Sequence, residues 1–334
     1  MDRIERLLKD WEPRIKAAFL ESVKAIRDRV VLADLVKALK IVDVEAALRI
    51  VGIEPVNFRP LAATLERFFE AAGIDATVGV NAGRGVGLAI FDVRSPRADN
   101  WIRTHATQLI TQITEDQRQM VREALTPLRL GGDQLLTGDT PQKLALDLVG
   151  RVSTVTRRRE GGILGLNAEQ AKWAQSYADS LADVPKADAL TRKLRDKRFD
   201  RTVAKAIREG TPIPAKTREA MVEAYRNRVL RLRAETIALN EASEVAHEAQ
   251  VEAWRQAVGR GVVAEAAVKR FWLDAEDSHV RPWHREVKKM NPNGVGLEQP
   301  FATPKGPTMQ PGWRFDPGCR CRVRVRVVDA GGTE

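Results

Sequence analysis

Hydrophobic side chains recur at steps of three and four residues along most of this chain, which is the pattern of amphipathic helices. One such stripe runs from Ile4 to Ile26. A longer helical pattern runs from about Lys216 to Val258, and an unbroken helix of that length would span roughly 65 Å. The apolar stripe of this segment loses its register near Asn240, which predicts a kink or a boundary there.

Capping residues predict where further helices begin. A short polar side chain bonds the free N–H groups of the first turn, and proline is tolerated at the first helical position. The helix that starts near Pro60 is expected to end by Gly73, and Thr114 with Gln117 resembles a capping box that opens a separate helix. The expected starts are Asp43, for a helix to about Val51, then Pro60, Ser95-Pro96, Thr114, Thr140-Pro141 and Asn167 with Gln170.

Only a few segments favour strands. Residues 76–80 and 88–93 are predicted as a strand and a second strand or extended segment, on either side of the glycine cluster 83–87. Near the C-terminus the pattern predicts a small module of alternating element types. Its expected parts are a strand over 266–273, a short helix or turn over 278–287, a long Pro/Gly loop over 290–318 and a final strand.

The final strand alternates strictly between two kinds of side chain. Because successive side chains on a strand point to opposite faces, the cysteines and valines from Cys319 to Val327 share one face. The opposite face carries Arg320, Arg322, Arg324 and Arg326. This arginine row is either a solvated edge strand protected from aggregation or a strip that contacts phosphates or an acidic partner surface.

The composition of the chain favours an anionic binding partner. The 334 residues carry a net charge of +10, which favours nucleic acid first and a membrane surface second. A basic run around Lys193, Lys197 and Arg198 is a further candidate contact. No apolar run approaches the roughly 20 residues of a membrane-spanning helix, and the start lacks a signal-peptide core. With only two cysteines, a disulfide framework is not expected, which favours a reducing cytoplasm.

Both cysteines and two of the four histidines fall near the C-terminus. His284, Cys319 and Cys321 can meet in space, with His279 or Asp277 as a fourth ligand. Zinc accepts such sets in tetrahedral geometry, and the Cys-x-Cys spacing on a strand aims both sulfurs to one side. The alternative is that the cysteines are small core residues and that His284 bonds the loop. Zinc is thus a candidate cofactor.

A second cluster of charged residues overlaps this one. Asp277, Arg281 and His284 share a helical face if their segment is helical. With Glu241 as a further carboxylate, these groups could serve hydrolysis or group transfer. The other interpretation, which we favour, is a salt-bridge network that fixes the long loop to the strands. Phe301 and Trp313 are expected to anchor that loop.

The same region resembles the C-terminal module of the phage head morphogenesis family, the minor capsid proteins similar to the F protein of phage Mu. Members carry an Ile-Ala-Arg-Thr-Glu segment, then a Trp-x-x-x-x-Asp-x-x-Val-Arg-x-x-His run, a Phe-containing loop and Cys-Arg-Cys near the C-terminus. In the first segment this chain keeps the glutamate as Glu241 but departs from the pattern at Leu239-Asn240. The matching residues here are Glu241, Trp272, Asp277, Val280, Arg281, His284, Phe301, Cys319, Arg320 and Cys321. The resemblance covers about 235–327, with a looser match over 91–182.

The sequence thus predicts a mainly α protein, a long-helix bundle with a small C-terminal α+β module. The expected regions are 1–90 (helical, portal docking), 91–186 (helical domain), 187–234 (basic region and connecting helix) and 235–329 (the Mu F-like module).

The resemblance implies a virion protein of the capsid interior or portal vertex, present in the host cytoplasm during assembly. Its implied partners are the portal, a scaffold or major capsid protein and packaged double-stranded DNA, and no membrane partner is expected. Its implied role is in head assembly or DNA ejection. Two alternatives stay open: a metal-dependent hydrolase or transferase using Asp277, His284 and Glu241, and a stand-alone non-specific DNA-binding protein.

Overall fold

The computed structural model describes residues 3–82, 88–130, 140–274, 280–312, 316 and 319–328, and within them the fold is mainly helical, as predicted. Asp277, His279, Trp313 and the glycine cluster 83–87 lie outside these ranges. Contacts divide the chain into two compact units, each made of separate sequence segments. We call them the C-terminal unit (1–16, 61–107 and 235–334) and the central unit (17–60 and 108–234). The four contiguous regions expected from the sequence stay a prediction.

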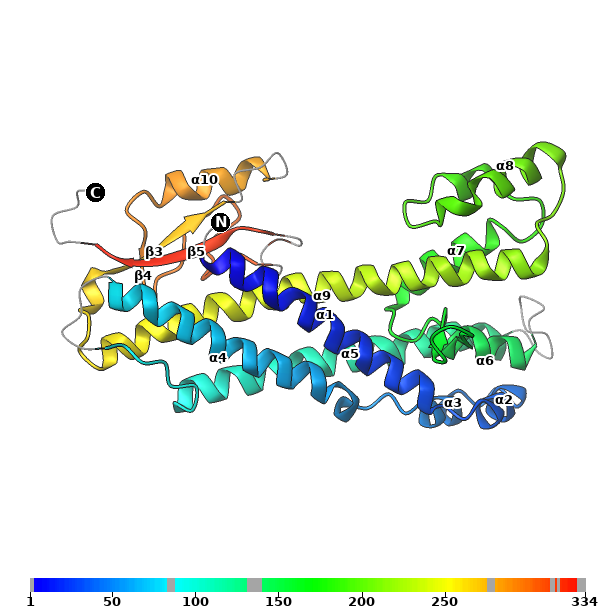
Figure 1. The fold of residues 1–334 in the computed structure, drawn as a ribbon, viewed down its shortest axis with the longest axis horizontal. Coiled ribbons are helices and arrows are strands. Elements are labelled where there is room, and N and C mark those ends of the chain that lie inside the picture. The colour runs from blue at the N-terminus through cyan, green and yellow to red at the C-terminus, as the bar shows by residue number, and fades with distance from the viewer. Residues whose placement is uncertain are drawn as a thin grey trace. The chain divides into compact units, whose positions relative to one another are not determined.

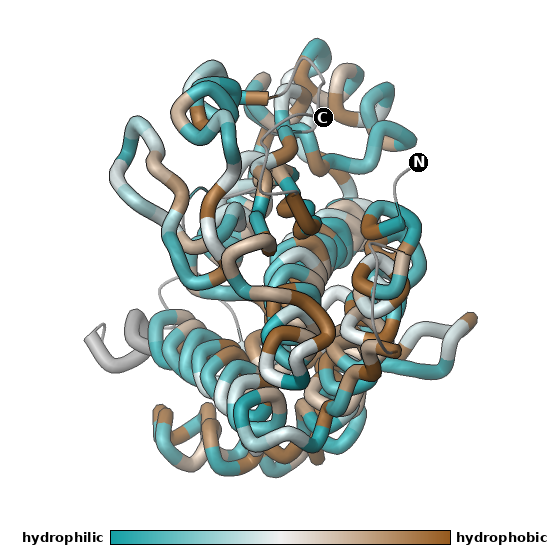
Figure 2. The backbone as a smooth tube through the Cα atoms, turned by 90° about the vertical axis from the view of Figure 1, so that its left-hand side faces the viewer, coloured by the Kyte–Doolittle hydropathy of each residue, from teal (hydrophilic) through white to brown (hydrophobic). Residues whose placement is uncertain are grey.

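Three long helices contribute several turns to each unit: α1 (Arg3–Arg29), α5 (Pro96–Leu130) and α9 (Ala215–Gly259) (Figure 1). Hydrophobic and hydrophilic residues alternate around the helical segments, as amphipathic packing requires (Figure 2). The remaining elements of the central unit are α2 (Leu32–Lys40), α3 (Val44–Val51), the 3-10 turn η1 (Pro55–Phe58), α6 (Pro141–Val149), the hairpin β1 (Arg151–Val152) and β2 (Arg159–Glu160), α7 (Ala168–Asp179), η2 (Ala187–Leu190), η3 (Lys197–Phe199) and α8 (Asp200–Glu209).

A buried arginine organises part of the central unit. Arg27 of α1 is almost fully buried and donates hydrogen bonds to the backbone carbonyls of Gly162, at 2.8 Å, and Leu164. Burial lowers the pKa of this guanidinium to about 10. Because buried carbonyls need partners, Arg27 fixes the loop that leads into α7.

The C-terminal unit combines the ends of long helices with a small sheet. Its own elements are α4 (Arg59–Ala82), which begins just before the unit does, η4 (Glu265–Ala267), β3 (Val268–Leu273), α10 (Pro282–Met290), β4 (Val295–Gly296) and β5 (Arg322–Val327). The sheet has the order β4–β3–β5, and both pairings are antiparallel. The register between β3 and β5 runs from Val268 opposite Val327 to Leu273 opposite Arg322.

One hydrophobic core joins the sheet to the end of α9. From the sheet come Trp272, Val323 and Val325, and from α9 come Val251 and Trp254. The cysteine and valine face of the last strand is buried, as its alternation predicted, whereas Arg320, Arg324 and Arg326 are exposed. The predicted first strand, short helix and final strand are thus confirmed as β3, α10 and β5, with bounds shifted by a few residues.

Several predicted helix starts are confirmed by the capping bonds themselves. The carboxylate of Asp43 accepts a hydrogen bond from the N–H of Ala46 at 2.8 Å, at the start of α3. Thr140 caps α6, and Asn167 forms a reciprocal capping box with Gln170 at the start of α7. Local sequence alone was sufficient here because each cap acts within three residues.

Residues 88–93, expected as a second strand or an extended segment, join no sheet. Two predictions about α4 and α5 were wrong. Helix α4 does not end at Gly73 but continues to Ala82, so the strand expected over 76–80 is helical. Thr114 and Gln117 do not open a helix; both are buried in the middle of α5. In each case the apolar stripe continues past the local signal, and burial of that stripe outweighs a glycine or a cap-like residue.

The kink or boundary expected near Asn240 does not interrupt the helix, although the division between the two units falls close by, between residues 234 and 235. Helix α9 is continuous from Ala215 to Gly259. All seven residues of 241–247 are buried, so this stretch is covered on every side. The apolar stripe loses its register because a fully surrounded helix has no solvent face to mark the period.

Candidate functional site in the C-terminal module

Three potential metal ligands converge in the C-terminal unit. The side chains of His284, Cys319 and Cys321 are buried, and one donor atom of each lies within 4.8 Å of the others. The Nδ1 atom of His284 is 3.1 Å from the sulfur of Cys321 and 3.8 Å from that of Cys319. The sequence pattern predicted this proximity, and the metal itself stays a prediction.

Local structure explains why these donors meet. Pro282 takes the first position of α10, where its missing N–H costs nothing, and so places His284 in the first turn. The two cysteines lead into β5 with two-residue spacing, so both sulfurs lie on the face that packs inward. Because β5 pairs with β3 along its whole length, the position of the cysteines relative to Trp272 is fixed.

The second nitrogen of the imidazole is held by Asp316. His284 Nε2 lies 2.8 Å from the Oδ2 atom of Asp316. The same carboxylate binds Arg281 at 3.0 Å and Lys305 at 3.5 Å. The salt-bridge network predicted around Arg281 and His284 therefore exists, but its described acid is Asp316, whereas Asp277 lies outside the described residues. The sequence did not indicate Asp316, because nothing in its spacing ties it to α10.

Aromatic rings surround this cluster. Trp272 and Trp283 each meet the His284 ring edge to face, with ring centroids 6.2 and 3.8 Å away. Phe301, the predicted loop anchor, is fully buried and packs edge to face on Trp272 at 5.4 Å. The ammonium of Lys305 lies over the Trp283 ring. These rings exclude water from one side of the imidazole and fix its plane.

Burial and hydrogen bonds set the protonation of the three donors. Burial lowers the pKa of His284, and the bond to Asp316 opposes this effect. A hydrogen bond from Cys321 lowers the pKa of the Cys319 thiol, while that bond and burial raise the pKa of Cys321. The first thiol to ionise is therefore Cys319, with the proton of Cys321 shared toward it.

The arginine row lies on the outer face of the same sheet. Arg322 is partly buried and contacts Glu5 of α1 at 3.3 Å, whereas the other three arginines are exposed. The guanidinium of Arg326 lies over the ring of Phe271 at 4.3 Å. The register places Lys269 directly opposite Arg326, so a fifth cation joins this face. We call the set Lys269, Arg320, Arg322, Arg324 and Arg326 the basic face.

The basic run of the central unit is partly neutralised within itself. Lys193, Lys197 and Arg198 are exposed. Arg198 binds the buried carboxylate of Asp196 at 2.7 Å, and this bond lowers the pKa of Asp196 to about 2. Arg198 is thus first a local partner of Asp196, and Lys193 and Lys197 are the better candidates for an outside contact.

Glu241, which the resemblance singled out, is bonded to His105 rather than to the His284 cluster. His105 Nε2 lies 2.7 Å from the Glu241 carboxylate, both groups are buried, and the His105 ring stacks on Trp101 at 4.7 Å. Among the described residues, the group of metal-capable donors includes His284 and both cysteines but not Glu241. The sequence pattern did not indicate this buried pair, because 136 positions separate His105 from Glu241.

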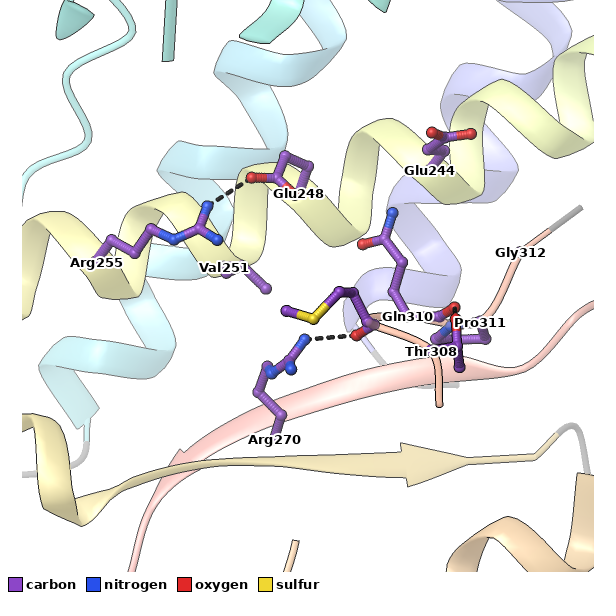
Figure 3. A pocket seen from close by; sticks show the side chains of 10 residues that line it. Glu244, Glu248, Val251, Arg255, Arg270, Thr308, Gln310, Pro311 and Gly312 are labelled. Atoms are coloured by element: carbon purple, nitrogen blue, oxygen red, sulfur yellow. Dashed lines mark hydrogen bonds and ion pairs between the residues drawn. The ribbon is translucent and has the colours of Figure 1, made fainter. Parts of the chain in front are cut away.

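A polar pocket of about 370 Å³ lies between α9 and the loop that precedes β5. In Figure 3, Arg255 and Glu248 of α9 point toward each other, and Arg270 extends into the pocket from β3. The Arg255 guanidinium binds Glu248 and Glu298, each at 2.6 Å. Arg270 is bonded to backbone carbonyls. Because both guanidiniums are already satisfied, we interpret the pocket as a structural seam.

No protein-family model, curated protein or solved structure matches this chain in the comparisons. None of the helices in the described ranges contains a stretch long and apolar enough to cross a membrane.

Proposed function

We propose that this protein is a minor capsid protein that takes part in head morphogenesis of a tailed phage or prophage. The observation that carries the proposal is the convergence of the residues that define the resemblance. Trp272, His284, Phe301, Cys319 and Cys321 come from four separate segments and pack in one buried cluster, with Arg281 bonded to the acid of that cluster. Residues that recur together in a motif are expected to share one local structure, and these do.

The basic face supports a contact with packaged DNA. Four of its cations lie side by side on the paired strands β3 and β5, and Arg320 comes just before β5; neither strand offers an acid on that face. Like charges directly opposite each other, as Lys269 and Arg326 are, destabilise a sheet unless a polyanion binds them. Recognition would be independent of sequence, since phosphate contacts carry no base information.

The helices near the N-terminus support docking on a larger assembly such as the portal. In the central unit, Val31, Ile41 and Val56 are 58%, 74% and 51% exposed. They lie within residues 31–56: Val31 and Ile41 flank α2, and Val56 is in η1. Exposed apolar side chains concentrated in one segment favour a protein partner over solvent. The portal, and then a scaffold or the major capsid protein, are the proposed partners, at the portal vertex or in the capsid interior.

Co-assembly tests the proposal. The protein should be expressed with the portal protein encoded in the same genome, and sedimentation should then carry it with portal rings. Ile41→Glu should weaken this association at least tenfold, because it places a charge in the docking segment. Val155→Glu is the matched control, since Val155 is 87% exposed in the same unit but far from that segment in sequence. Heads that assemble and package DNA normally without the protein would contradict the proposal.

A stand-alone non-specific DNA-binding protein is the second candidate, and the basic face is the observation that favours it. Binding to DNA without any association with portal rings or heads would select this candidate. The hydrolase or transferase hypothesis uses Glu241 together with His284. It gains no support from the structure, because Glu241 is bonded to His105 instead. In either remaining case the host cytoplasm is the place where the protein acts first.

A further inference from the structure

The imidazole of His284 is oriented as a metal ligand would be. Its Nδ1 atom faces both sulfurs, at 3.1 and 3.8 Å, while its Nε2 atom is bound to Asp316. In a tetrahedral zinc site with bonds of about 2.3 Å to sulfur and 2.0 Å to nitrogen, neighbouring sulfur and nitrogen ligands lie roughly 3.6 Å apart. The two distances at His284 lie on either side of this value. A shift of a few tenths of an ångström would bring both nitrogen–sulfur distances to this value.

The residue that binds the second nitrogen of His284 is of the kind found behind metal-bound histidines. A histidine that binds a metal usually donates its other N–H to a carboxylate, which fixes the ring and its tautomer. Asp316 has this position, and it is itself bound by Arg281 and Lys305. Such a chain of contacts orients Nδ1 toward the sulfurs with its lone pair free.

Charge balance points to a divalent cation. Two thiolates from Cys319 and Cys321 would cancel the charge of one divalent ion, and the charge of Asp316 is already met by Arg281 and Lys305. Thiolate and imidazole ligands favour zinc over magnesium or calcium, which prefer oxygen. The aromatic rings of Trp272 and Trp283 add a water-poor environment in which this neutral assembly is stable.

We propose that His284, Cys319 and Cys321 bind one Zn²⁺ ion, and that Asp316 is the positioning residue that orients His284. The ion would join α10 to the entrance of β5, two elements that lie more than 30 positions apart in the sequence. The ion would stabilise the fold of the module by linking these two elements. The proposal concerns these three ligands and does not depend on the role in head assembly.

Zinc titration of the full-length, reduced protein tests the proposal. After treatment with a chelator, the protein should take up one zinc ion per chain in competition with a chromogenic indicator. Co²⁺ in place of zinc should give the intense visible bands of a tetrahedral site, with thiolate-to-metal charge transfer in the near ultraviolet. Zinc should also protect both cysteines of the wild-type protein from alkylation, a readout that needs no substitution.

The zinc affinity of substituted proteins distinguishes the residues that bind the ion from the residues next to them. Cys319→Ser with Cys321→Ser, and His284→Gln alone, should lower zinc affinity more than about 100-fold, whereas Asp316→Asn should lower it about 10- to 100-fold. His247→Gln is the matched control, because His247 is another buried histidine of the same unit and should keep one zinc per chain. Circular dichroism of each variant checks folding.

Three results would overturn the proposal. The first is less than one equivalent of zinc in the folded wild-type protein. The second is Co²⁺ spectra without thiolate charge transfer. The third is unchanged affinity in the double cysteine variant. In those cases the cluster is a hydrogen-bonded core in which a thiol of Cys321 faces the His284 nitrogen.

Discussion

Arg270 of β3 donates a hydrogen bond from its Nη1 atom to the backbone carbonyl of Met309 at 2.6 Å, although its side chain is almost completely buried. The same guanidinium also donates to the carbonyls of Gly296 and Gln299. Its carbon lies 5.2 Å from the centre of the Phe301 ring. One side chain thus connects β3 to β4 and to two further points of the loop between α10 and β5.

Replacing Arg270 with methionine should therefore destabilise the C-terminal unit. Methionine fills a similar volume but leaves three carbonyls without this donor, and we expect a loss of about 3 kcal/mol in the free energy of unfolding. Urea denaturation followed by tryptophan fluorescence measures this change, since Trp254 and Trp272 lie in the same core. Arg324→Met, on the exposed side of β5, is the control and should change stability by less than about 0.5 kcal/mol.

Two glycines of α4 should respond to alanine in opposite directions. A Cβ atom at Gly73 would overlap the ring of Phe91, whereas one at Gly79 would meet no atom within 4 Å. Gly73→Ala should cost about 1–3 kcal/mol by overpacking. Gly79→Ala should stabilise the unit by about 1 kcal/mol, because alanine favours helix more than glycine does. Thermal denaturation of both variants measures the difference, and equal effects would mean that Phe91 does not pack on α4 as described.

The fate of Gly73 shows where sequence reasoning stops. A glycine within an apolar stripe is ambiguous locally: it can end a helix or admit a close neighbour. The ring that uses the space left by Gly73 is Phe91, 18 positions along the chain, and no local pattern identifies it. The caps at Asp43, Thr140 and Asn167 were predictable because their partners lie three residues away.

The candidate site also has features that the sequence predicts and features that it does not. Strand alternation was enough to place Cys319 and Cys321 on one face, and the parity of β3 places Arg270 on the buried side with Val268 and Trp272. The partners of these groups were not predictable. Asp316 and the carbonyls around Arg270 belong to the long loop, whose path depends on contacts made after folding. Such long-range polar contacts leave no periodic signal in a single sequence.

His247 should make the C-terminal unit less stable in mild acid. Its Nε2 atom accepts a hydrogen bond from the Val323 N–H at 3.3 Å, and burial lowers the pKa of His247 to about 4, which the Pro311 carbonyl partly opposes. The unfolded chain, with a pKa near 6.5, binds the proton more readily between about pH 6.5 and pH 4. The stabilisation is therefore complete above the unfolded pKa and is lost as the pH falls toward 4.

The expected size is about 2 kcal/mol of unfolding free energy between pH 7 and pH 5. Urea denaturation at both pH values measures it. In His247→Gln the amide oxygen can still accept the bond from Val323, but nothing titrates at this position. The wild type should lose about 2 kcal/mol more than the variant over this interval. Parallel loss in the two proteins would show that other groups, such as carboxylates, cause the acid sensitivity.

The basic face should make DNA binding strongly dependent on salt. Each cation that contacts a phosphate releases a counterion, which contributes about 0.9 to the slope of log affinity against log salt concentration on double-stranded DNA. Replacing Arg320, Arg324 and Arg326 with glutamine should therefore weaken binding equally for unrelated sequences and reduce the slope by roughly 1 for each arginine that contacts DNA. Fluorescence anisotropy with a short random duplex at several salt concentrations measures both quantities.

The control replaces Arg6, Arg67 and Arg103, three exposed arginines on helices of the same unit, so that the net charge changes equally. If this control lowers the slope as much as the strand variant does, the interaction follows total charge and the sheet has no special part in it. A lower slope in the strand variant alone would locate the phosphate contacts on β5.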